Sequence, residues 1–248
     1  MFFFRDDKAI IFIHIPKSGG TSIKTLLERN GWENKANFDR GKGHPCYEQW
    51  SSIKKEFENN GTVFDFEFAL VRNPYDRIES RYWQYRRELG NTTPMALEIL
   101  NDFSSPVNVK SSFLNGYDNR RCGRKEDFFH FTGFSLNTER FDPRLDDNHF
   151  LPQHAFVSDN TEIFKLEEKN SLLDALKQNG YVGKDSKIPH IRSRGRPVTS
   201  DIFCEPETEN FMRLNLSWNE NDSIKKIHDR FLEVYLKDFK TFGYEIDE

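Results

Sequence analysis

Apolar and polar residues alternate along the first third of the chain in a pattern that predicts strands and helices in turn. An apolar, mostly β-branched run over residues 10–13 predicts a short buried strand. After a turn, apolar residues at helical spacing predict a helix over residues 21–29 that ends at Asn30-Gly31. A second helix is expected over residues 47–57, and a second, mostly apolar strand over residues 63–71.

Pro74 marks the next helix, because proline suits a first turn and apolar residues then recur at spacings of three and four up to Leu89. The other expected elements are helices over 94–103, 109–114 and 171–178 (the last capped by Ser171), strands over 155–157 and 162–166, and an amphipathic helix over 224–239 that ends near Gly243. This order favours an α/β fold with a parallel sheet, and the lack of repeats or linkers favours one domain over residues 1–248.

Composition and charge restrict the class of protein. A chain of 248 residues can bury a sizeable core, and 24 phenylalanines predict a core rich in aromatic rings. The net charge of −4 argues against nucleic acid as the main partner. Cys46, Cys122 and Cys204 have neither a metal-ligand spacing nor a disulfide pattern. No stretch approaches the ~20 apolar residues of a membrane span, and the first residues do not form a signal peptide, so a cytoplasmic protein without a membrane partner is expected.

The segment between the first strand and the first helix carries a candidate anion site. It reads Pro16-Lys17-Ser18-Gly19-Gly20-Thr21-Ser22, and we call it the glycine loop. Glycines let the backbone approach a ligand closely, and unpaired N–H groups at a helix N-terminus favour an anion. Lys17 adds a cation, while Thr21 and Ser22 add hydroxyl donors. The alternative is a tight turn with a surface lysine. The Walker pattern does not apply, because the lysine precedes the glycines.

A second candidate site follows the second strand. Arg72 ends that strand, and Ser80 lies eight residues later in the helix that begins near Pro74. A guanidinium fork and a helix hydroxyl can meet at one phosphate group. The alternative is that Arg72 serves as a cap or in an ion pair and that Ser80 is a surface serine.

Both segments resemble motifs of the sulfotransferases that use 3′-phosphoadenosine 5′-phosphosulfate (PAPS). The glycine loop resembles their 5′-phosphosulfate loop, and residues 71–82 resemble their 3′-phosphate motif. The similarity is greater to the carbohydrate sulfotransferases, both small bacterial members and the heparan and chondroitin enzymes. Residues 147–153 resemble their His-aromatic-x-Pro-Gln segment, and residues 238–244 resemble their C-terminal ending.

The resemblance implies a P-loop-like three-layer α/β fold with a central parallel sheet flanked by helices. It also implies that PAPS is the sulfuryl donor, that a hydroxyl group is the acceptor and that no metal is needed. The implied contacts to the 5′-phosphate and sulfuryl groups are Lys17, Ser18, Gly19, Gly20, Thr21 and Ser22; those to the 3′-phosphate are Arg72 and Ser80. Lys17 is expected to neutralise charge on the leaving phosphate oxygen.

Transfer to a hydroxyl group calls for a general base, and histidine is the usual one near neutral pH. His44 resembles in position the base of relatives that modify uronic acids, and His149 in the Pro-Gln segment is the second candidate. The alternative for His44 is a loop histidine that caps the next helix. His14, in the first strand, is expected to be a packed histidine beside the glycine loop.

Two questions stay open at the level of the sequence. Arg192, Arg194 and Arg196 could contact the 3′-phosphate or an acidic acceptor, or form a solvated basic loop; relatives often carry asparagine and serine where Arg192 and Arg194 stand. The leading hypothesis is transfer to a carbohydrate hydroxyl. Its alternatives are a P-loop-type small-molecule kinase and a non-catalytic nucleotide- or glycan-binding protein on the same fold.

Overall fold

A computed structural model describes residues 1–35, 44–90, 132, 136, 148–189 and 222–246. The chain divides into two compact units. The first unit consists of Met1–Arg77, Asp142–Arg192 and Val234–Ile246, and the second of Ile78–Phe141, Ser193–Glu233 and Asp247–Glu248. A single domain over the whole chain stays a prediction.

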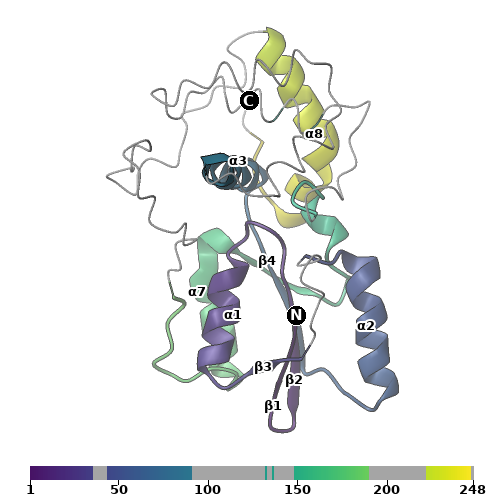
Figure 1. Ribbon diagram of the computed structural model, residues 1–248, viewed down its shortest axis with the longest axis vertical. Helices are drawn as coiled ribbons and strands as arrows, with labels where there is room; N and C mark the ends of the chain where they lie inside the picture. Colours follow the sequence, from purple (N-terminus) through teal and green to yellow (C-terminus); the bar gives the residue numbers. More distant parts are fainter. Residues whose placement is uncertain (36–43, 91–131, 133–135, 137–147, 190–221, 247–248) are drawn as a thin grey trace. The chain divides into compact units, whose positions relative to one another are not determined.

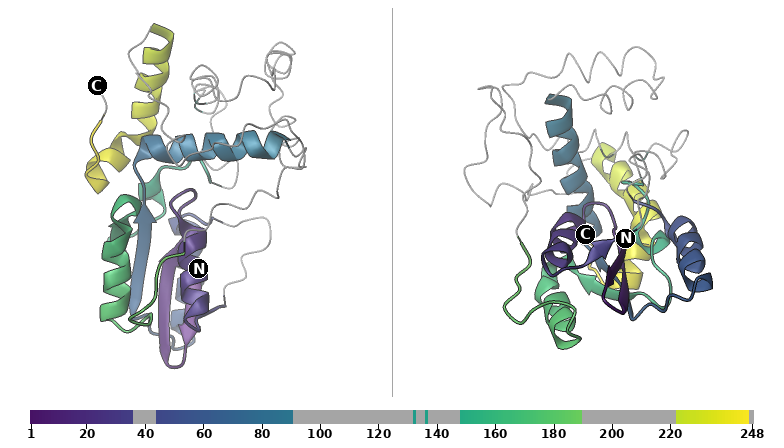
Figure 2. Two further views of the ribbon diagram at one scale, coloured as in Figure 1. Left: turned by 90° about the vertical axis from the view of Figure 1, so that its left-hand side faces the viewer. Right: turned by 60° about the horizontal axis from the view of Figure 1, so that its bottom comes forward.

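The first unit is built on a mixed sheet of five strands in the order β3-β1-β2-β4-β5. The strands are β1 (Phe2–Arg5), β2 (Lys8–Ile13), β3 (Glu33–Asn34), β4 (Phe66–Val71) and β5 (Glu162–Lys165). β2, β4 and β5 are parallel, as Figure 2 shows for β2 and β4, and Ile13 lies opposite Ala69. The predicted parallel sheet is therefore confirmed in its core, while β1 and β3 add an antiparallel edge.

The β1–β2 hairpin explains the phenylalanines at the start of the chain. Phe2 pairs with Ile11 and Phe3 with Ile10, and both phenylalanines are fully buried. The hairpin turns at Asp6, whose φ of 54° lies in the left-handed region that aspartate tolerates better than most residues.

Helices cover both faces of the sheet. The described helices are α1 (Gly20–Arg29), α2 (Tyr47–Asn59), α3 (Pro74–Gly90), α7 (Lys169–Gln178) and α8 (Asp222–Phe242), with single turns η1 (Gln153–Ala155) and η2 (Leu166–Glu168). α1 and α7 lie side by side on one face, and α2 lies on the other (Figure 1). This layered arrangement is the expected α/β architecture.

Alternation along β2 sends side chains into two separate cores. Ile10 and Phe12 pack with residues of α1 and α7, whereas Ile11 and Ile13 pack on the other face with Trp50 of α2. Each large apolar side chain that is fully buried contributes roughly 1.5–3 kcal/mol. Packing on both faces therefore fixes the sheet. It also fixes the points from which the loops after the parallel strands begin.

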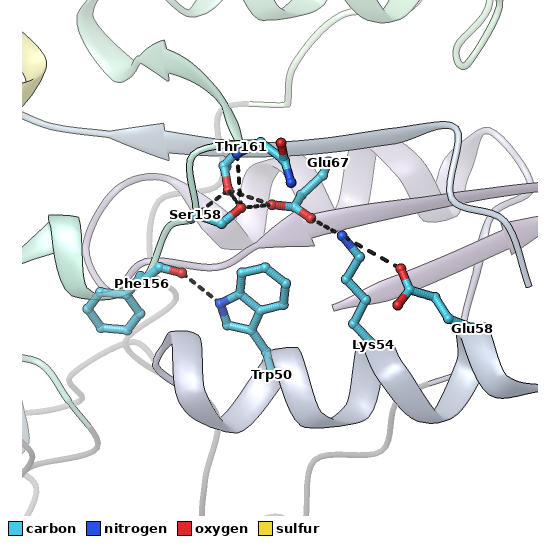
Figure 3. Close-up of polar contacts among 8 residues, drawn as sticks. Trp50, Lys54, Glu58, Glu67, Phe156, Ser158 and Thr161 are labelled. Atoms are coloured by element: carbon cyan, nitrogen blue, oxygen red, sulfur yellow. Dashed lines mark hydrogen bonds and ion pairs between the residues drawn. The ribbon is translucent and has the colours of Figure 1, made fainter.

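A buried polar cluster fastens α2 to the sheet (Figure 3). The Glu67 carboxylate on β4 accepts hydrogen bonds from Lys54 Nζ at 2.8 Å, from Ser158 Oγ at 2.7 Å and from Thr161 Oγ1 at 2.5 Å. Burial raises the pKa of Glu67, but the bonds from Lys54, Thr161 and Ser158 outweigh burial and hold this pKa below its usual value. Glu67 is therefore ionised at neutral pH, and its role is to join α2 to the sheet.

Several local predictions differ from the structure. The strand expected over 155–157 is wrong, because the N–H groups of Gln153 and His154 bind the Asp238 carboxylate and the chain forms the turn η1 instead. α7 begins at Lys169, so Ser171 is not its cap; the Ser171 hydroxyl donates to the carbonyl of Glu168. The strand expected from residue 63 begins at Phe66. The helices expected over 94–103 and 109–114 lie outside the described residues.

The second unit is described mainly through α3 from Ile78 onwards and α8 up to Glu233. Arg230 Nε donates to the carbonyl of Leu136 at 3.0 Å, and Trp83 Nε1 donates to Glu79 Oε1 at 3.2 Å. Among the helices that the structure describes, none has the length and apolar character needed to cross a membrane.

Candidate active site

Three chain segments meet where the parallel strands of the first unit end. The glycine loop follows β2, Arg72 and Asn73 follow β4, and η2 follows β5. Because carboxyl ends of parallel strands share one edge of a sheet, this edge is the usual place for a ligand in an α/β fold. The sequence-predicted residues Lys17 and Arg72 both lie there.

The glycine loop contains two left-handed residues. Lys17 has a φ of 68° and Gly19 a φ of 79°. This conformation costs glycine almost nothing, but it costs a residue with a Cβ roughly 1–2 kcal/mol. Strain of this kind concentrates at functional sites, where the surrounding structure holds it in place. The backbone at Lys17 is therefore consistent with a functional role for this residue.

The N-terminus of α1 is open to an anion. Gly19 caps the helix without any side-chain hydrogen bond, and the first turn carries no acidic residue. The N–H groups of Gly20 and Thr21 have no hydrogen-bond acceptor within the described part of the chain, whereas that of Ser22 donates to the Gly19 carbonyl at 3.0 Å. Free N–H groups and the helix dipole together favour a negatively charged ligand.

Both glycines of the loop are needed for close packing. A Cβ on Gly20 would overlap the imidazole ring of His14, and one on Gly19 would come within 2.8 Å of Leu166 in η2. The glycine loop is thereby pressed against β2 on one side and against the segment after β5 on the other. No side chain can be added at either glycine without moving these neighbours.

His14 is confirmed as a packed histidine beside the glycine loop. Its Nδ1 is buried without a hydrogen-bond partner in the part of the chain that the structure describes. Burial lowers the pKa of His14 well below its usual value, and the neighbouring His44, the Met1 amino group, Lys24 and Lys17 lower it further. The His14 imidazole is therefore neutral at pH 7.

Arg72 is tied directly to the glycine loop. Its Nη1 donates to the carbonyl of Lys17 at 3.3 Å. The next residue, Asn73, caps α3 by accepting the N–H of Tyr75 at 2.9 Å, and its own N–H donates to Glu167 in η2. These contacts hold the three segments at the end of the sheet together. Ser80 lies on α3 within the second unit, and its joint role with Arg72 stays a prediction.

Arg77, in the first turns of α3, joins the glycine loop to the segment that contains His149. Its buried guanidinium donates to three carbonyl oxygens: Pro16 at 3.0 Å, Leu151 at 2.9 Å and His149 at 3.0 Å. Burial lowers the pKa of Arg77 from its usual value, against the opposite effects of Tyr235 and Asp238. An arginine remains charged even so, and the site therefore contains a buried cation that no sequence prediction assigned.

The two candidate bases lie next to one another. The ring centroid of His44 is 5.0 Å from that of His149 and 4.5 Å from that of His14, with the rings edge to face in both pairs. Asn148 Nδ2 donates to the His44 carbonyl at 2.8 Å, which holds the main chain at His44. His149 is buried, and Arg77 holds its carbonyl. The structure thus brings together two histidines that are 105 positions apart, at numbers 44 and 149.

The remaining predicted residues divide into two groups. Ser18 is buried and its hydroxyl donates to Gln153 at 3.3 Å, while Thr21 is exposed in the first turn of α1. Arg192, Arg194 and Arg196 lie outside the described residues. Within the described residues, no group of three His, Cys, Asp or Glu side chains is arranged to hold a metal ion.

Sequence reasoning assigned no role to Gln153, Arg77 or Asp238, although each lies inside a segment that resembles a family motif. Gln153 and Asp238 are fully buried, and Arg77 is 3% exposed. Their position inside these motifs was the one feature of the sequence that could have pointed to a role for them. Their partners lie 61 to 135 positions away in the sequence, so no local spacing identifies the contacts.

Taken together, the described residues form an α/β sheet with a glycine loop and a strand-end arginine in contact at the carboxyl ends of its parallel strands. In a comparison with protein families, the model of the sulfotransferase family matches residues 1–245, and the chain belongs to this family. It is therefore a PAPS-dependent sulfotransferase, which favours the leading hypothesis over a small-molecule kinase and over a non-catalytic binding protein. Neither a curated protein nor a solved structure matches the chain.

Proposed function

We propose that this sulfotransferase transfers a sulfuryl group from PAPS to a hydroxyl group of a carbohydrate, with the glycine loop and Arg72 holding the donor. The observation that carries the proposal is the hydrogen bond from Arg72 Nη1 to the Lys17 carbonyl. This bond joins a strand-end guanidinium to the main chain of the glycine loop, shortly before α1 begins at Gly20. A donor with two anionic ends needs two such neighbouring groups of cations and N–H donors.

The described residues fit the 5′ end of the donor. The N–H groups of Gly20 and Thr21 are available, Gly19 has no side chain, and Lys17 supplies a positive charge. The hydroxyl of Ser22 is the further proposed contact. The Ser18 hydroxyl donates to Gln153 and the Ser18 N–H donates to the Ile15 carbonyl at 3.4 Å, so a contact from Ser18 to the donor would require one of these hydrogen bonds to be exchanged. At the 3′ end, Arg72 is the proposed contact, and Ser80 remains predicted from the sequence.

Sulfuryl transfer breaks the bond between sulfur and the bridging phosphate oxygen and forms one between sulfur and the acceptor oxygen. By analogy with phosphoryl transfer, the protein supplies in-line positioning and stabilises charge on the oxygens. Lys17 neutralises the charge that develops on the leaving phosphate oxygen. The left-handed backbone at Lys17 sets the point from which the flexible side chain reaches towards the donor.

The acceptor hydroxyl loses its proton during transfer, and we propose that an imidazole nitrogen of His44 receives it. His149 is the second candidate, and its ring lies 5.0 Å from that of His44. Only a neutral imidazole can accept the proton, so the rate should fall at acid pH as the base becomes protonated. Replacing the true base should remove this acid limb of the pH–rate profile, whereas replacing the other histidine should leave it.

Transfer of radiolabelled sulfate tests the proposal. The assay offers PAPS with labelled sulfur against monosaccharides and oligosaccharides, with lipids and small alcohols as the competing acceptors. Lys17→Ala and Arg72→Ala should each abolish transfer, whereas the exposed Lys55→Ala and Arg29→Ala controls should retain it. Labelling of a lipid or a simple alcohol, but of no sugar, would contradict the carbohydrate assignment.

Location and partners also belong to the proposal. A cytoplasmic protein that binds neither nucleic acid nor membrane stays a prediction from the net charge and from the expected lack of a membrane span and a signal peptide. Fractionation of the producing cells tests the location, and recovery of the protein with membranes would contradict it.

A further inference from the structure

The Gln153 side chain lies between the two parts of the proposed donor site. Gln153 is fully buried, in the turn η1. A buried primary amide must satisfy two N–H donors and a carbonyl acceptor, so its partners reveal what it holds in place. All the partners of Gln153 described below belong to the first unit.

Gln153 pairs with the main chain of Arg72 in both directions. The Arg72 N–H donates to Gln153 Oε1 at 2.9 Å, and Gln153 Nε2 donates to the Arg72 carbonyl at 2.7 Å. This is the hydrogen-bonding pattern that a neighbouring strand would supply, continued by one side chain past the end of β4. The backbone of Arg72 is therefore fixed although it lies outside the strand.

The same amide also contacts the glycine loop. The hydroxyl of Ser18, a residue 1% exposed, donates to Gln153 Oε1 at 3.3 Å. One oxygen atom thus accepts from the main chain of Arg72 and from the side chain of Ser18. Motion of either segment would disturb the hydrogen bond to the other.

Asp238 of α8 fixes Gln153 itself. Its fully buried carboxylate accepts the N–H of Gln153 at 2.7 Å and that of His154 at 2.9 Å, and it contacts His154 Nδ1 at 2.7 Å. Hydrogen bonds to a carboxylate are stronger than bonds between neutral groups. The turn η1 is therefore held rigidly, and the Gln153 amide projects from a fixed point.

We propose that Gln153 is a positioning residue that couples the glycine loop to Arg72, so that the 5′ and 3′ ends of the donor bind cooperatively. This inference rests on the proposed donor site. Gln153 keeps Arg72 in the position that a 3′-phosphate requires while the glycine loop holds the 5′ end. Without Gln153, each end still binds, but binding at one end no longer prepares the other.

Titration calorimetry with a pair of nucleotides tests the coupling. Adenosine 3′,5′-bisphosphate and adenosine 5′-phosphate differ only in the 3′-phosphate, so the ratio of their affinities measures the contribution of that group. In Gln153→Met, which keeps the length of the side chain but removes both hydrogen-bonding groups, this ratio should fall by about tenfold. Gln178→Met, a matched change at an exposed position of α7, should leave it unchanged.

A double-mutant cycle separates positioning from a general loss of structure. In an Arg72→Ala background, Gln153→Met should cause no further change in the ratio, because Gln153 acts through Arg72. A purely structural role would instead weaken both nucleotides equally and leave the ratio as in the wild-type protein. If Gln153→Met does not fold, the neutral variant Gln153→Leu provides the same test, since it also removes both hydrogen-bonding groups without adding a charge.

The outcomes distinguish this inference from the proposed function. If the wild-type protein prefers the bisphosphate and Gln153→Met or Gln153→Leu prefers it equally, the coupling role is overturned while the donor site stands. If the wild-type protein binds neither nucleotide, the donor site is overturned, and the inference with it. The coupling is supported if Gln153→Met lowers the affinity ratio in the wild-type background and causes no further change in the Arg72→Ala background.

Discussion

The Nε–H of Arg77 donates a hydrogen bond to the carbonyl oxygen of Pro16, 3.0 Å away, at a position where the arginine is almost fully buried. The other two nitrogens of the same guanidinium hold the carbonyls of Leu151 and His149. One side chain thus joins the residue before Lys17 to the segment with a candidate base. The planar fork of arginine makes this possible, because it directs several N–H groups in fixed directions.

Replacing Arg77 with lysine should therefore destabilise the protein although the charge is kept. Lysine cannot reach three separate carbonyls in the same geometry, so buried acceptors lose their donors. Because each unsatisfied buried group costs about 1–3 kcal/mol, the free energy of unfolding of Arg77→Lys should fall by at least about 2 kcal/mol. Urea unfolding measures it, with Arg29→Lys at the exposed end of α1 as the control. Equal unfolding midpoints for Arg77→Lys and wild type would show that the carbonyl contacts contribute no stability.

Lys17 should show a trade-off between stability and activity. In Lys17→Gly the left-handed backbone is relieved, so the protein should be as stable as wild type or up to about 1 kcal/mol more stable. Lys17→Ala keeps the strain and should gain nothing. Both variants lose the ammonium group and should lose sulfuryl transfer. Thermal unfolding and the labelled-sulfate assay check the two effects separately, and an active Lys17→Gly enzyme would be the contrary result.

His14 should make stability depend on pH near neutrality. Its folded pKa lies well below the unfolded value of about 6.5, so the unfolded chain binds the proton first as the pH falls. The wild-type protein should then lose stability below pH ~6.5 by up to about 1.4 kcal/mol per pH unit, until the folded pKa is reached.

The non-titrating variant His14→Gln lacks this proton-linked loss. Urea unfolding at pH 7.5 and at pH 5.5 gives the comparison: wild type should lose more stability than the variant between the two conditions. All other groups are common to the two proteins, so only the difference between wild type and the variant matters. Parallel losses in wild type and His14→Gln would contradict the neutral, buried state of His14.

Glu67 should stabilise the protein above its pKa and not in acid. Its folded pKa is lowered by Lys54, Thr161 and Ser158 despite burial, so its contribution is present above the unfolded pKa and disappears as the pH falls through the folded pKa. Glu67→Gln should cost about 1–3 kcal/mol at pH 7, and this difference should shrink towards pH 3.

The control for Glu67 is its neighbour in the same cluster. Glu58 lies 3.9 Å from Lys54 Nζ, but 46% of its side chain is exposed, so Glu58→Gln should cost less than about 1 kcal/mol at either pH. Denaturant unfolding of both variants at pH 7 and pH 3 measures these differences in the free energy of unfolding. A difference for Glu67→Gln that is equally large at pH 3 and pH 7 would argue against the ionised cluster.

Local sequence patterns predicted the elements that carry their own start and stop signals. The Asn30-Gly31 end of α1, Pro74 at the start of α3 and the apolar stripe of α8 all agree with the structure. β1 was missed because a four-residue strand has no periodicity of its own and forms only by pairing with β2. The strand predicted over residues 155–157 is wrong because its apolar residues pack against the core without strand pairing: Phe156 is buried, and Ala155 and Val157 are partly buried. Asp238 binds the nearby backbone at Gln153 and His154.

The candidate site was predictable only in part. Lys17 and Arg72 could be predicted because they are cations beside a glycine turn and at a strand end. The two histidines could be predicted because histidine is the usual general base near neutral pH. Gln153 and Asp238 do not, because a buried amide and a buried carboxylate are defined by partners that lie more than 80 positions away in the chain. Such pairings arise from the topology of the sheet, which places the ends of β2, β4 and β5 at one edge.

In the proposed donor site, the glycine loop and Arg72 hold a nucleotide with two anionic ends. Titration calorimetry of the intact protein with adenosine 3′,5′-bisphosphate tests it most directly. We expect saturable binding at one site, weakened about 10- to 100-fold in Lys17→Ala and in Arg72→Ala, because each variant loses hydrogen bonds to a charged group. Binding that is absent in wild type, or unchanged in both variants, would contradict the account.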